Sequence, residues 1–262
     1  MIMLLSETGF TFNGKHSYRD MGCLWAEDGH AIIPEFDYNE LELSGRDGTL
    51  VLESGTRREK MKHSGTLYPV VEPQNQAEAQ KLIRKLGSWL GCGQQRLIYD
   101  YEPDKYYLAK IAGGSSWSLE HWFGGEIPVT FELQPLAYSV DETTATASGD
   151  NASLDIPLAM DTGVDAPVQI SITNTGKAIT FLTAYVNDEQ VFTAGSLAAG
   201  KTLRIENDVP CGVYLEDDLA AGMALTTLFK PGLVHSGENR ITVACTSTAP
   251  GLDVTVSARG RF

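Results

Sequence analysis

RLIYDYEPDKYYLAKIAG, residues Arg96–Gly113, is the stretch that decides how the first half of this chain folds. Two runs rich in Tyr, Leu and Ile flank Glu102–Lys105, where Pro and Asp favour a turn. Counting outward from that turn predicts a β-hairpin that sets Tyr101 opposite Tyr106, Tyr99 opposite Leu108 and Leu97 opposite Lys110. The register stays open, because Pro103 cannot adopt the positive φ of a tight primed turn.

One face of this hairpin is expected to be buried. Side chains alternate along a strand, so the predicted register sends Ile98, Asp100, Tyr107 and Ala109 to one face and a larger apolar set to the other. A hairpin alone is marginally stable, so the apolar face must pack in a core or in a protein contact. That face comprises Leu97, Tyr99, Tyr101, Tyr106 and Leu108.

The composition places the chain among folded, acidic proteins. Its 262 residues suffice for one large or two ordinary domains, and an apolar content of 42% suffices for real cores. The formal charge of −14 and the pI near 4.7 argue against a nucleic-acid-binding surface, which requires a basic face. The four cysteines stand far apart without a CxxC pair, so we expect buried, reduced thiols rather than a disulfide scaffold.

The start of the chain, MIMLLSETGF, holds a short apolar run with no basic residue before it. Such a run is too short for a signal peptide and for a membrane span. We therefore expect a protein made in the cytoplasm, with no signal peptide and no membrane association.

Residues 75–91 carry a strong helix pattern. Asn75 is a favourable N-cap with Glu78 three residues later, and Gly91 stands where a C′ glycine belongs. The helix is expected to lay an apolar stripe on a sheet that contains the Tyr-rich hairpin. The stripe consists of Ala79, Leu82, Ile83, Leu86 and Leu90, and the opposite face carries Lys81, Arg84 and Lys85.

Two turn signals organise the residues before this helix. Asn13-Gly14 is a strong hairpin-turn signal. The sequence GRDG at residues 45–48 predicts a second turn between two half-buried strands. The apolar residues of those two strands are Leu41, Leu43, Leu50 and Leu52.

A compositional step divides the chain near residue 140. All four tryptophans, including Trp117 and Trp122 in a Gly/Ser-rich loop, precede it, as do 17 of the 23 aromatic residues. Asp141–Asn151 contains no large apolar residue and is interpreted as a linker. We therefore predict an α+β N-terminal domain at residues 1–140, with one clear helix packed on a β-sheet, and a second domain at residues 141–262.

The second domain has the pattern of a β-sandwich, so the predicted fold class is mainly β. Short apolar runs alternate with turn signals such as Asn187-Asp188. Leu215–Phe229 is ambiguous, because Gly222 interrupts its helical spacing. The seven expected strands lie near Ser153–Ala159, Val168–Asn174, Ile179–Asn187, Gln190–Ala194, Thr202–Glu206, Arg240–Thr246 and Leu252–Ala258.

The segment Gly195–Thr202, GSLAAGKT, matches the letters of a phosphate-binding loop. Such a loop requires a helix that begins at its Lys, so that backbone N–H groups point at the phosphates. Thr202–Asp208 instead alternates with the period of a strand. We interpret GSLAAGKT as a turn between two sandwich strands and expect no nucleotide-binding site.

Other patterns typical of catalysis or metal binding are missing from the sequence. The five histidines stand at least fourteen residues apart, and no serine lies in a GxSxG motif. Asp217 and Asp218 are interpreted as part of a solvated acidic loop, with a calcium site as the alternative. We therefore predict no enzyme, no catalytic residue, no metal site and no cofactor.

A basic cluster in residues 56–65 has two interpretations. Its cations fit a solvated loop or edge strand, where Lys blocks aberrant pairing. They also fit a docking patch for an acidic neighbour. The candidate protein-contact residues are the four cations and two tyrosines of the hairpin: Arg57, Arg58, Lys60, Lys62, Tyr101 and Tyr106.

Several turn signatures, taken in order, resemble those of the distal tail proteins of siphophages, which are baseplate hub proteins. The matching stretches of the first half are FTFNGKHSYRDMG from Phe10, SGRDGTL from Ser44, LIYDYEPDKYYLAKIAG from Leu97 and VTFELQPLAYSV from Val129. The end of the chain, PGLVHSGENRITVAC to LDVTVSARGRF, is similar to the end of that family's galectin-like C-terminal domain. The resemblance covers nearly the whole chain.

The resemblance implies a structural protein of a phage, prophage or tailocin, located at the virion tail tip and made in the host bacterial cytoplasm. The N-terminal domains of the family form a hexameric ring, through which DNA passes, and the galectin-like β-sandwich projects from it. The implied partners are other copies of the chain, the tail tube protein and the tail-associated lysin or tail-tip fibre protein, with a receptor-binding protein in some relatives. Specific nucleic-acid binding is not implied.

A carbohydrate-binding β-sandwich protein that contacts host-surface glycans is the alternative function. Some relatives carry a carbohydrate-binding insertion in the sandwich, but the region after residue 140 is too short for one. Sugar sites also favour exposed aromatic residues, and residues 141–262 hold only six aromatics.

Overall fold

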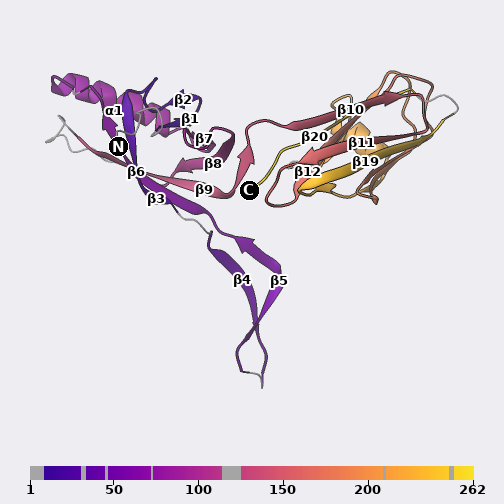
Figure 1. The fold of residues 1–262 in the computed structure, drawn as a ribbon, viewed down its shortest axis with the longest axis horizontal. Coiled ribbons are helices and arrows are strands. Elements are labelled where there is room, and N and C mark those ends of the chain that lie inside the picture. The colour runs from indigo at the N-terminus through magenta and orange to yellow at the C-terminus, as the bar shows by residue number, and fades with distance from the viewer. Residues whose placement is uncertain are drawn as a thin grey trace. The chain divides into compact units, whose positions relative to one another are not determined.

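The computed structural model describes residues 9–30, 34–44, 47–71, 73–113, 125–208, 211–247 and 251–262. The chain forms two compact units, Met1–Ala137 and Tyr138–Phe262. Strands dominate both units (Figure 1). The predicted mainly β fold class is confirmed.

A seven-stranded antiparallel sheet forms the frame of the first unit, in the order β2-β1-β7-β8-β9-β6-β3. Asn13 and Gly14 have φ of 50° and 68° and form the predicted turn between β1 and β2. The strands are β1 (Phe10–Phe12), β2 (Lys15–His16), β3 (Cys23–His30), β6 (Met61–Pro69), β7 (Gln95–Tyr99), β8 (Lys105–Ile111) and β9 (Ile127–Ser139).

Aromatic side chains from several strands of this sheet pack against one another in the core. Phe10 on β1 contacts Trp25 on β3 at a centroid distance of 5.1 Å and Phe131 on β9 at 5.2 Å. β1 lies near one end of the strand order and β3 lies at the other end. The sheet must therefore curl for these rings to meet around one core.

Helix α1 (Gln76–Leu90) begins and ends at the predicted positions, but the glycine that follows it differs in conformation. The Asn75 side chain accepts the Glu78 N–H at 3.0 Å, so the predicted N-cap is confirmed. Gly91 has φ −81°, which is not left-handed, whereas Gly93 has φ 79°. The predicted C′ glycine is therefore wrong, because the chain turns two residues later.

The helix packs on the curled sheet through a residue outside the predicted stripe. Trp89 is buried, stacks on Phe10 at 5.5 Å and donates its Nε1–H to the Phe12 carbonyl at 2.7 Å. Of the predicted stripe, Ala79, Leu86 and Leu90 are buried, whereas Leu82 and Ile83 are half-buried. The helix therefore covers the core as expected, with its contact face rotated towards Trp89.

The Tyr-rich hairpin has a different register from the predicted one. β7 and β8 pair Leu97 with Tyr107, not with Lys110. The shift is an odd number of residues, and an odd shift moves side chains to the opposite face. Tyr107 and Ala109 therefore lie on the face of Leu97 and Tyr99, whereas Tyr106 and Leu108 do not.

A longer loop causes this shift. The Glu102 N–H donates to the Tyr99 carbonyl at 3.0 Å, and the Lys105 N–H donates to the Glu102 carbonyl at 3.2 Å. Two successive turns thus replace the predicted single turn. Leu97 and Tyr99 remain buried as predicted, but Tyr101 leaves the strand and is 50% exposed.

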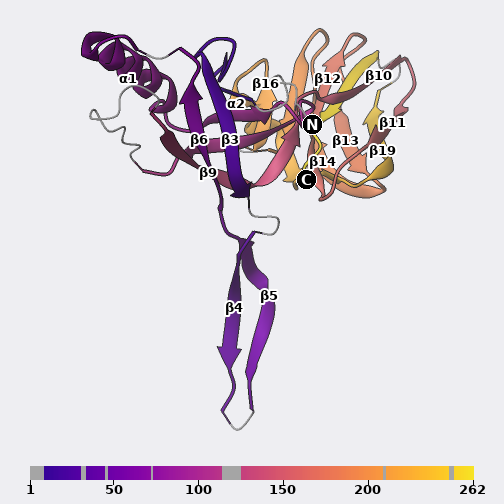
Figure 2. The ribbon, with the colours of Figure 1, turned by 60° about the vertical axis from the view of Figure 1, so that its left-hand side comes forward.

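β4 (Phe36–Glu42) and β5 (Thr49–Arg58) form a separate two-stranded sheet, called here the arm. Both views show it extending beyond the seven-stranded sheet (Figures 1 and 2). All seven residues of β4 are exposed, so the predicted half-buried strands are wrong for β4. The alternation does indicate a strand there, but the core of the unit does not cover it.

The second unit is a β-sandwich around one apolar core. β11 shows the expected alternation, with Leu154, Ile156, Leu158 and Met160 buried. One sheet contains β10 (Thr143–Gly149), β20 (Leu252–Ala258), β12 (Ala166–Asn174), β15 (Thr202–Glu206) and β16 (Gly212–Leu215), with β18 (Leu233–Val234) pairing β12. The other contains β11 (Ser153–Met160), β19 (Gly237–Thr246), β13 (Phe181–Val186), β14 (Glu189–Ala194) and β17 (Thr226–Phe229).

The predicted linker at Asp141–Asn151 is wrong. Its central part is strand β10, paired with β20 from Thr143 opposite Ala258 to Gly149 opposite Leu252. Backbone hydrogen bonds hold an edge strand, and its threonines favour extended backbone even without large apolar side chains.

The ambiguous segment Leu215–Phe229 contains both a helix and a strand. α2 (Leu219–Leu225) begins at the N-cap Asp218 and runs directly into β17. Gly222 lies inside α2, where an added Cβ would stand 2.2 Å from the Val213 carbonyl oxygen. This glycine therefore lets α2 approach β16 rather than interrupting the helix.

The two ends of the second unit are tied together. Tyr138 pairs with Arg261, and the Ser139 N–H donates to the Gly260 carbonyl at 3.0 Å. The Arg259 guanidinium donates to the Ser139 carbonyl at 2.6 Å and to the Glu142 carboxylate at 2.8 Å. The first residues of this unit thus lie beside Arg259–Arg261.

The cysteines are free, and not all are buried as predicted. Cys23 is buried, and burial raises the pKa of its thiol to about 11 although Lys85 opposes the shift. Cys211 is exposed, which corrects the prediction. Within the part of the chain that the structure describes, no helix has the length and apolarity to cross a membrane.

Candidate interaction surfaces

The arm carries an exposed apolar face. Its register pairs Leu41 with Leu50 and Asn39 with Leu52, so these side chains lie on one side of the two-stranded sheet. Leu41 is 45% exposed and Leu43, next along the same alternation, is 40% exposed. We call Leu41, Leu43, Leu50 and Leu52 the leucine face.

The opposite side of the arm is acidic. Glu40 pairs with Val51 and Glu42 pairs with Thr49, which places both glutamates away from the leucine face. Near the base, Phe36 stacks on Tyr38 at a centroid distance of 5.8 Å, and Tyr38 is 53% exposed. The arm therefore presents an exposed apolar face on one side and carboxylates on the other.

The four predicted cations differ in their contacts. Arg57 lies in the arm and pairs with Asp37 at 3.2 Å and Glu59 at 3.1 Å. Arg58 ends β5 and is exposed. Lys60 binds Glu132 at 2.7 Å, and hydrogen bonds from Lys60 and then Lys110 lower the pKa of that carboxyl.

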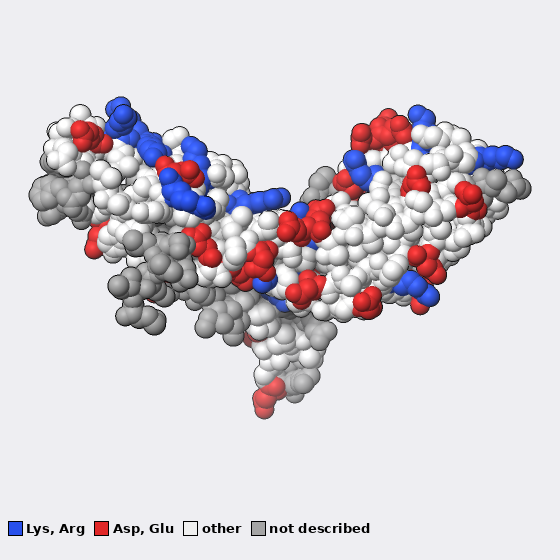
Figure 3. All heavy atoms as spheres, turned by 45° about the horizontal axis from the view of Figure 1, so that its top comes forward, with Lys and Arg blue, Asp and Glu red and all other residues white. Residues whose placement is uncertain are grey.

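Lys62, the last of the four cations, points outward from β6. Cations gather instead over α1, as the blue atoms in the upper left of Figure 3 show. This helix exposes Lys81, Arg84 and Lys85 and contains one acid, Glu78, in its first turn. The sequence analysis had already placed these three cations on the polar face of the predicted helix. The run at residues 56–65 was chosen as the candidate because its cations are denser along the sequence.

The two predicted contact tyrosines lie in different environments. Tyr106 is buried, with the Arg96 guanidinium 4.5 Å from its ring centroid. Tyr101 is half exposed and stacks on Tyr99 at 5.0 Å. Of the two, only Tyr101 offers its ring to a partner.

Beneath Tyr101 lies a buried polar contact. The Tyr99 hydroxyl is 3.0 Å from His63 Nδ1, and both side chains are buried. Burial raises the pKa of the Tyr99 hydroxyl, and Tyr101, Glu27 and Tyr107 raise it further. Burial also raises the pKa of Tyr101, with Glu27 contributing. These hydroxyls therefore remain protonated and serve packing and hydrogen bonding.

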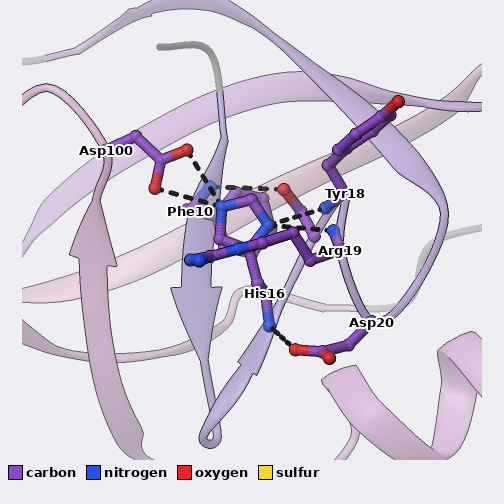
Figure 4. Close-up of polar contacts among 7 residues, drawn as sticks. Phe10, His16, Tyr18, Arg19, Asp20 and Asp100 are labelled. Atoms are coloured by element: carbon purple, nitrogen blue, oxygen red, sulfur yellow. Dashed lines mark hydrogen bonds and ion pairs between the residues drawn. The ribbon is translucent and has the colours of Figure 1, made fainter. Parts of the chain in front are cut away.

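His16 and Asp100 have the distances of a catalytic dyad. His16 Nε2 lies 2.9 Å and 3.1 Å from the two Asp100 carboxylate oxygens (Figure 4). His16 Nδ1 accepts the N–H groups of Tyr18 and Arg19, each at 3.1 Å. Both ring nitrogens are therefore engaged by groups of the same chain. The contact joins the β1–β2 hairpin to the end of β7. Because His16 and Asp100 are 84 residues apart in sequence, no local pattern predicted this contact.

The segment Gly195–Thr202 joins β14 to β15, and Thr202 is already part of a strand. Lys201 lies 3.7 Å from Glu216. The helix that a phosphate-binding loop requires after its Lys is replaced here by β15.

The acidic residues near Asp217 have structural partners. Asp218 accepts the N–H groups of Ala220 and Ala221, and Asp217 pairs with Arg204 at 2.8 Å. The Glu216 carboxylate accepts the Thr202 N–H at 2.7 Å. Their carboxylates thus cap α2 and bind neighbouring groups, and no group of metal ligands was found among the described residues.

The sandwich has a polar hollow of about 410 Å³ at the β13–β14 turn. Asn187 there donates to Asn239 at 2.8 Å, and Arg240 pairs with Asp188. None of the described residues lining it is Phe, Tyr or Trp. The hollow therefore lacks the stacking platform common in sugar sites.

The predicted Gly/Ser-rich loop with Trp117, His121 and Trp122 lies outside the described residues. The same holds for the apolar run MIMLL at the start.

Comparison with known proteins finds a domain match in the first unit and similar folds among solved structures. Residues 28–133, less than half of the chain, match the model of the phage tail protein RIFT-related domain. This match includes the arm, α1 and the Tyr-rich hairpin. A search of curated proteins found no significant sequence match.

Two solved structures of phage proteins are similar over nearly their full length. The crystal structure of the SPP1 Dit (gp 19.1) protein, described as a paradigm of the hub adsorption apparatus in phages infecting Gram-positive bacteria, has a TM-score of 0.70 at 12% identity and covers 97% of this chain and 98% of its own. A chain of the phage P2 baseplate in its activated conformation with Ca has a TM-score of 0.50 at 7% identity, with coverages of 96% and 97%. Identities this low show the fold, and together with the domain match they confirm the predicted resemblance to siphophage distal tail proteins.

Proposed function

We propose that this chain is a structural distal tail protein, the baseplate hub of a phage, prophage or tailocin tail. Residues 1–140 would form a homohexameric ring, and residues 141–262 a galectin-like sandwich attached to it. The observation that carries the proposal is the phage-tail-protein domain match at residues 28–133 within a chain that has the Dit fold over 97% of its length.

The proposed role is mechanical rather than catalytic. The ring would join the tail tube protein to the tail-associated lysin or tip fibre, at the tail tip, and support host adsorption. The acidic charge of −14 fits a passage that does not retain DNA.

Light scattering after size exclusion, combined with negative-stain imaging, tests the ring. We expect six-fold ring classes from the purified protein or after addition of the tail tube and lysin proteins. A monodisperse monomer under both conditions would contradict the proposal. The carbohydrate-binding alternative gains no support from a hollow that lacks Phe, Tyr and Trp, and binding on an array of bacterial wall glycans would revive it.

A further inference from the structure

Strand β10 (Thr143–Gly149) forms an edge of the sandwich with one open side (Figure 1). It stands first in the strand order β10-β20-β12-β15-β16, and β20 is its one partner among the described strands. The pairing runs from Thr143 opposite Ala258 to Gly149 opposite Leu252 without a register shift. The next strand along the chain, β11, pairs with β19 in the other sheet. The open side of β10 therefore presents a regular row of unpaired N–H and C=O groups.

The other edge strands of the three larger sheets are protected against pairing, whereas β10 is not. Pro157 stands in the middle of β11, and a proline cannot donate a hydrogen bond to an added strand. The register of β3 shifts between Glu27 and Gly29, which marks an irregularity that disrupts a regular edge. β2 has two residues, and β16 and β17 have four each. β10 has seven residues and contains no Pro, Lys or other charged side chain, so it is the template for pairing that protein edges usually avoid.

The side chains of β10 fit an added strand on both faces. Ala145 and Ala147 pack against the apolar core of the sandwich and remain partly exposed. Apolar side chains on an added strand would cover these two alanines and extend that core. Thr144, Thr146 and Ser148 lie on the opposite face and are exposed, so they can form cross-strand pairs with threonines.

The charges at the two ends of β10 indicate what kind of strand fits. Asp141 lies before the strand and Asp150 directly after it, and both are exposed. Neither makes an ion pair with a described residue, whereas Glu142 binds Arg259 at 2.8 Å. An added strand with Lys or Arg at both ends would therefore meet one free carboxylate at each end.

The same carboxylates disfavour a second copy of this chain as the occupant. If two β10 strands paired antiparallel over their full length, Asp141 and Glu142 of each copy would meet Asp150 of the other. In a parallel pair, each carboxylate would meet its own equivalent. Like charges opposite each other on neighbouring strands are destabilising, so the charges select a different protein.

We propose that β10 binds an extended segment of another protein, which adds to the sheet as a further strand. The segment alternates apolar side chains with Thr or Ser over about seven residues and carries Lys or Arg at both ends. Main-chain hydrogen bonds to the open side of β10 supply the affinity, and the two free carboxylates supply specificity. The inference concerns the second unit and does not depend on the ring proposed for the first.

A cyclised β-hairpin peptide is a suitable probe, because cyclisation reduces the entropy that an extended strand loses on binding. Its outer strand reads Lys-Thr-Val-Thr-Val-Thr-Val-Thr-Lys, and a second peptide has Glu in place of the two Lys. Fluorescence anisotropy measures the binding of each labelled peptide to the full-length protein. We expect saturable binding of the Lys peptide, at least about tenfold tighter than binding of the Glu peptide.

Charge reversal on the protein tests the site. Asp141→Lys with Asp150→Lys should weaken binding of the Lys peptide by about tenfold or more and strengthen binding of the Glu peptide. Both side chains are exposed, so the melting temperature should stay unchanged. The matched control, Asp165→Lys with Glu238→Lys, makes the same charge change at exposed acids before β12 and in β19, and should keep the preference for the Lys peptide.

Amide hydrogen exchange locates the added strand. The Lys peptide should slow exchange within Thr143–Gly149, whereas the same peptide N-methylated along its outer edge should not, because it cannot donate hydrogen bonds to β10. Absence of binding, binding without protection of β10, or a peptide preference that the charge reversal leaves unchanged would overturn the proposal. Protection of β10 that rises with protein concentration in the absence of peptide would also overturn it, because a second copy would then occupy the edge.

Discussion

The β7–β8 hairpin and the arm lie in one unit and each has an apolar face, yet the surroundings of those faces are opposite. In the hairpin, Leu97 is fully buried and Tyr99 is 1% exposed. In the arm, Leu41 is 45% exposed on the equivalent kind of face. The difference teaches that a sequence pattern can predict a strand with an apolar face. The pattern does not predict whether that face is buried within its own chain.

A buried charge should produce the largest difference between the two hairpins. Tyr99→Asp places a carboxylate in the core beside His63, and we expect a loss of about 4 kcal/mol or more in the free energy of unfolding. Circular dichroism with urea titration measures it. Tyr101→Asp is the matched control, since that ring is 50% exposed and should tolerate the change. A folded, native-like Tyr99→Asp variant would contradict the face assignment.

Leucine truncation compares the two regions directly. Leu97→Ala should lower the free energy of unfolding by about 3 kcal/mol, because it leaves a cavity in a packed core. Leu41→Ala should change it by less than about 0.5 kcal/mol in the monomer, because that side chain is already exposed. Urea unfolding at low protein concentration measures both, and equal losses would show that the arm is packed within its own chain.

Alkaline pH should reveal a smaller difference in stability between the hairpin and the arm than the preceding substitutions do. Burial raises the pKa of Tyr99 in the folded protein, so above its ordinary value of about 10 the unfolded chain ionises first. Stability is therefore complete below about pH 10 and is lost as pH rises towards the folded pKa. Tyr99→Phe should flatten this slope and cost about 1 kcal/mol at neutral pH through the lost His63 contact.

The control for this titration is Tyr38→Phe in the arm. Its ring is 53% exposed, so the substitution should leave the stability at neutral pH unchanged. Unfolding followed by tryptophan fluorescence between pH 8 and about pH 11 compares the variants. An unchanged slope in Tyr99→Phe would contradict the assignment.

The smallest effect is expected at the base of the arm. Arg57→Ala removes exposed ion pairs to Asp37 and Glu59, and such pairs contribute roughly 0–1 kcal/mol. We expect a change below about 0.5 kcal/mol in thermal unfolding. A larger loss would show that Arg57 fastens the arm to the unit.

Much of the second unit could be predicted from the sequence, because each inward residue of its strands meets a partner sheet in the same chain. Strands β15 and β20 have the predicted bounds, Thr202–Glu206 and Leu252–Ala258. β10 could not be predicted, since its small side chains leave no alternation and its partner β20 lies about a hundred residues away. The N-cap Asn75 could be predicted because its hydrogen bond spans three residues.

The candidate site was harder to predict for the same physical reason. The hairpin register depended on two consecutive turns, and an error of an odd number of residues exchanged its faces. The leucines of the arm were predicted to lie on two half-buried strands, but exposure depends on what surrounds them. The His16–Asp100 contact joins distant segments, and no local pattern announces it.

The tie between Tyr138, Ser139 and the segment Arg259–Arg261 has an evolutionary consequence. A domain whose two terminal segments adjoin can be exchanged or duplicated without breaking the sheet of its neighbour. Recombination between related genes could therefore swap the whole sandwich as a cassette while the first unit keeps its own contacts. Chimeras joined at residue 138 should fold as two independent modules.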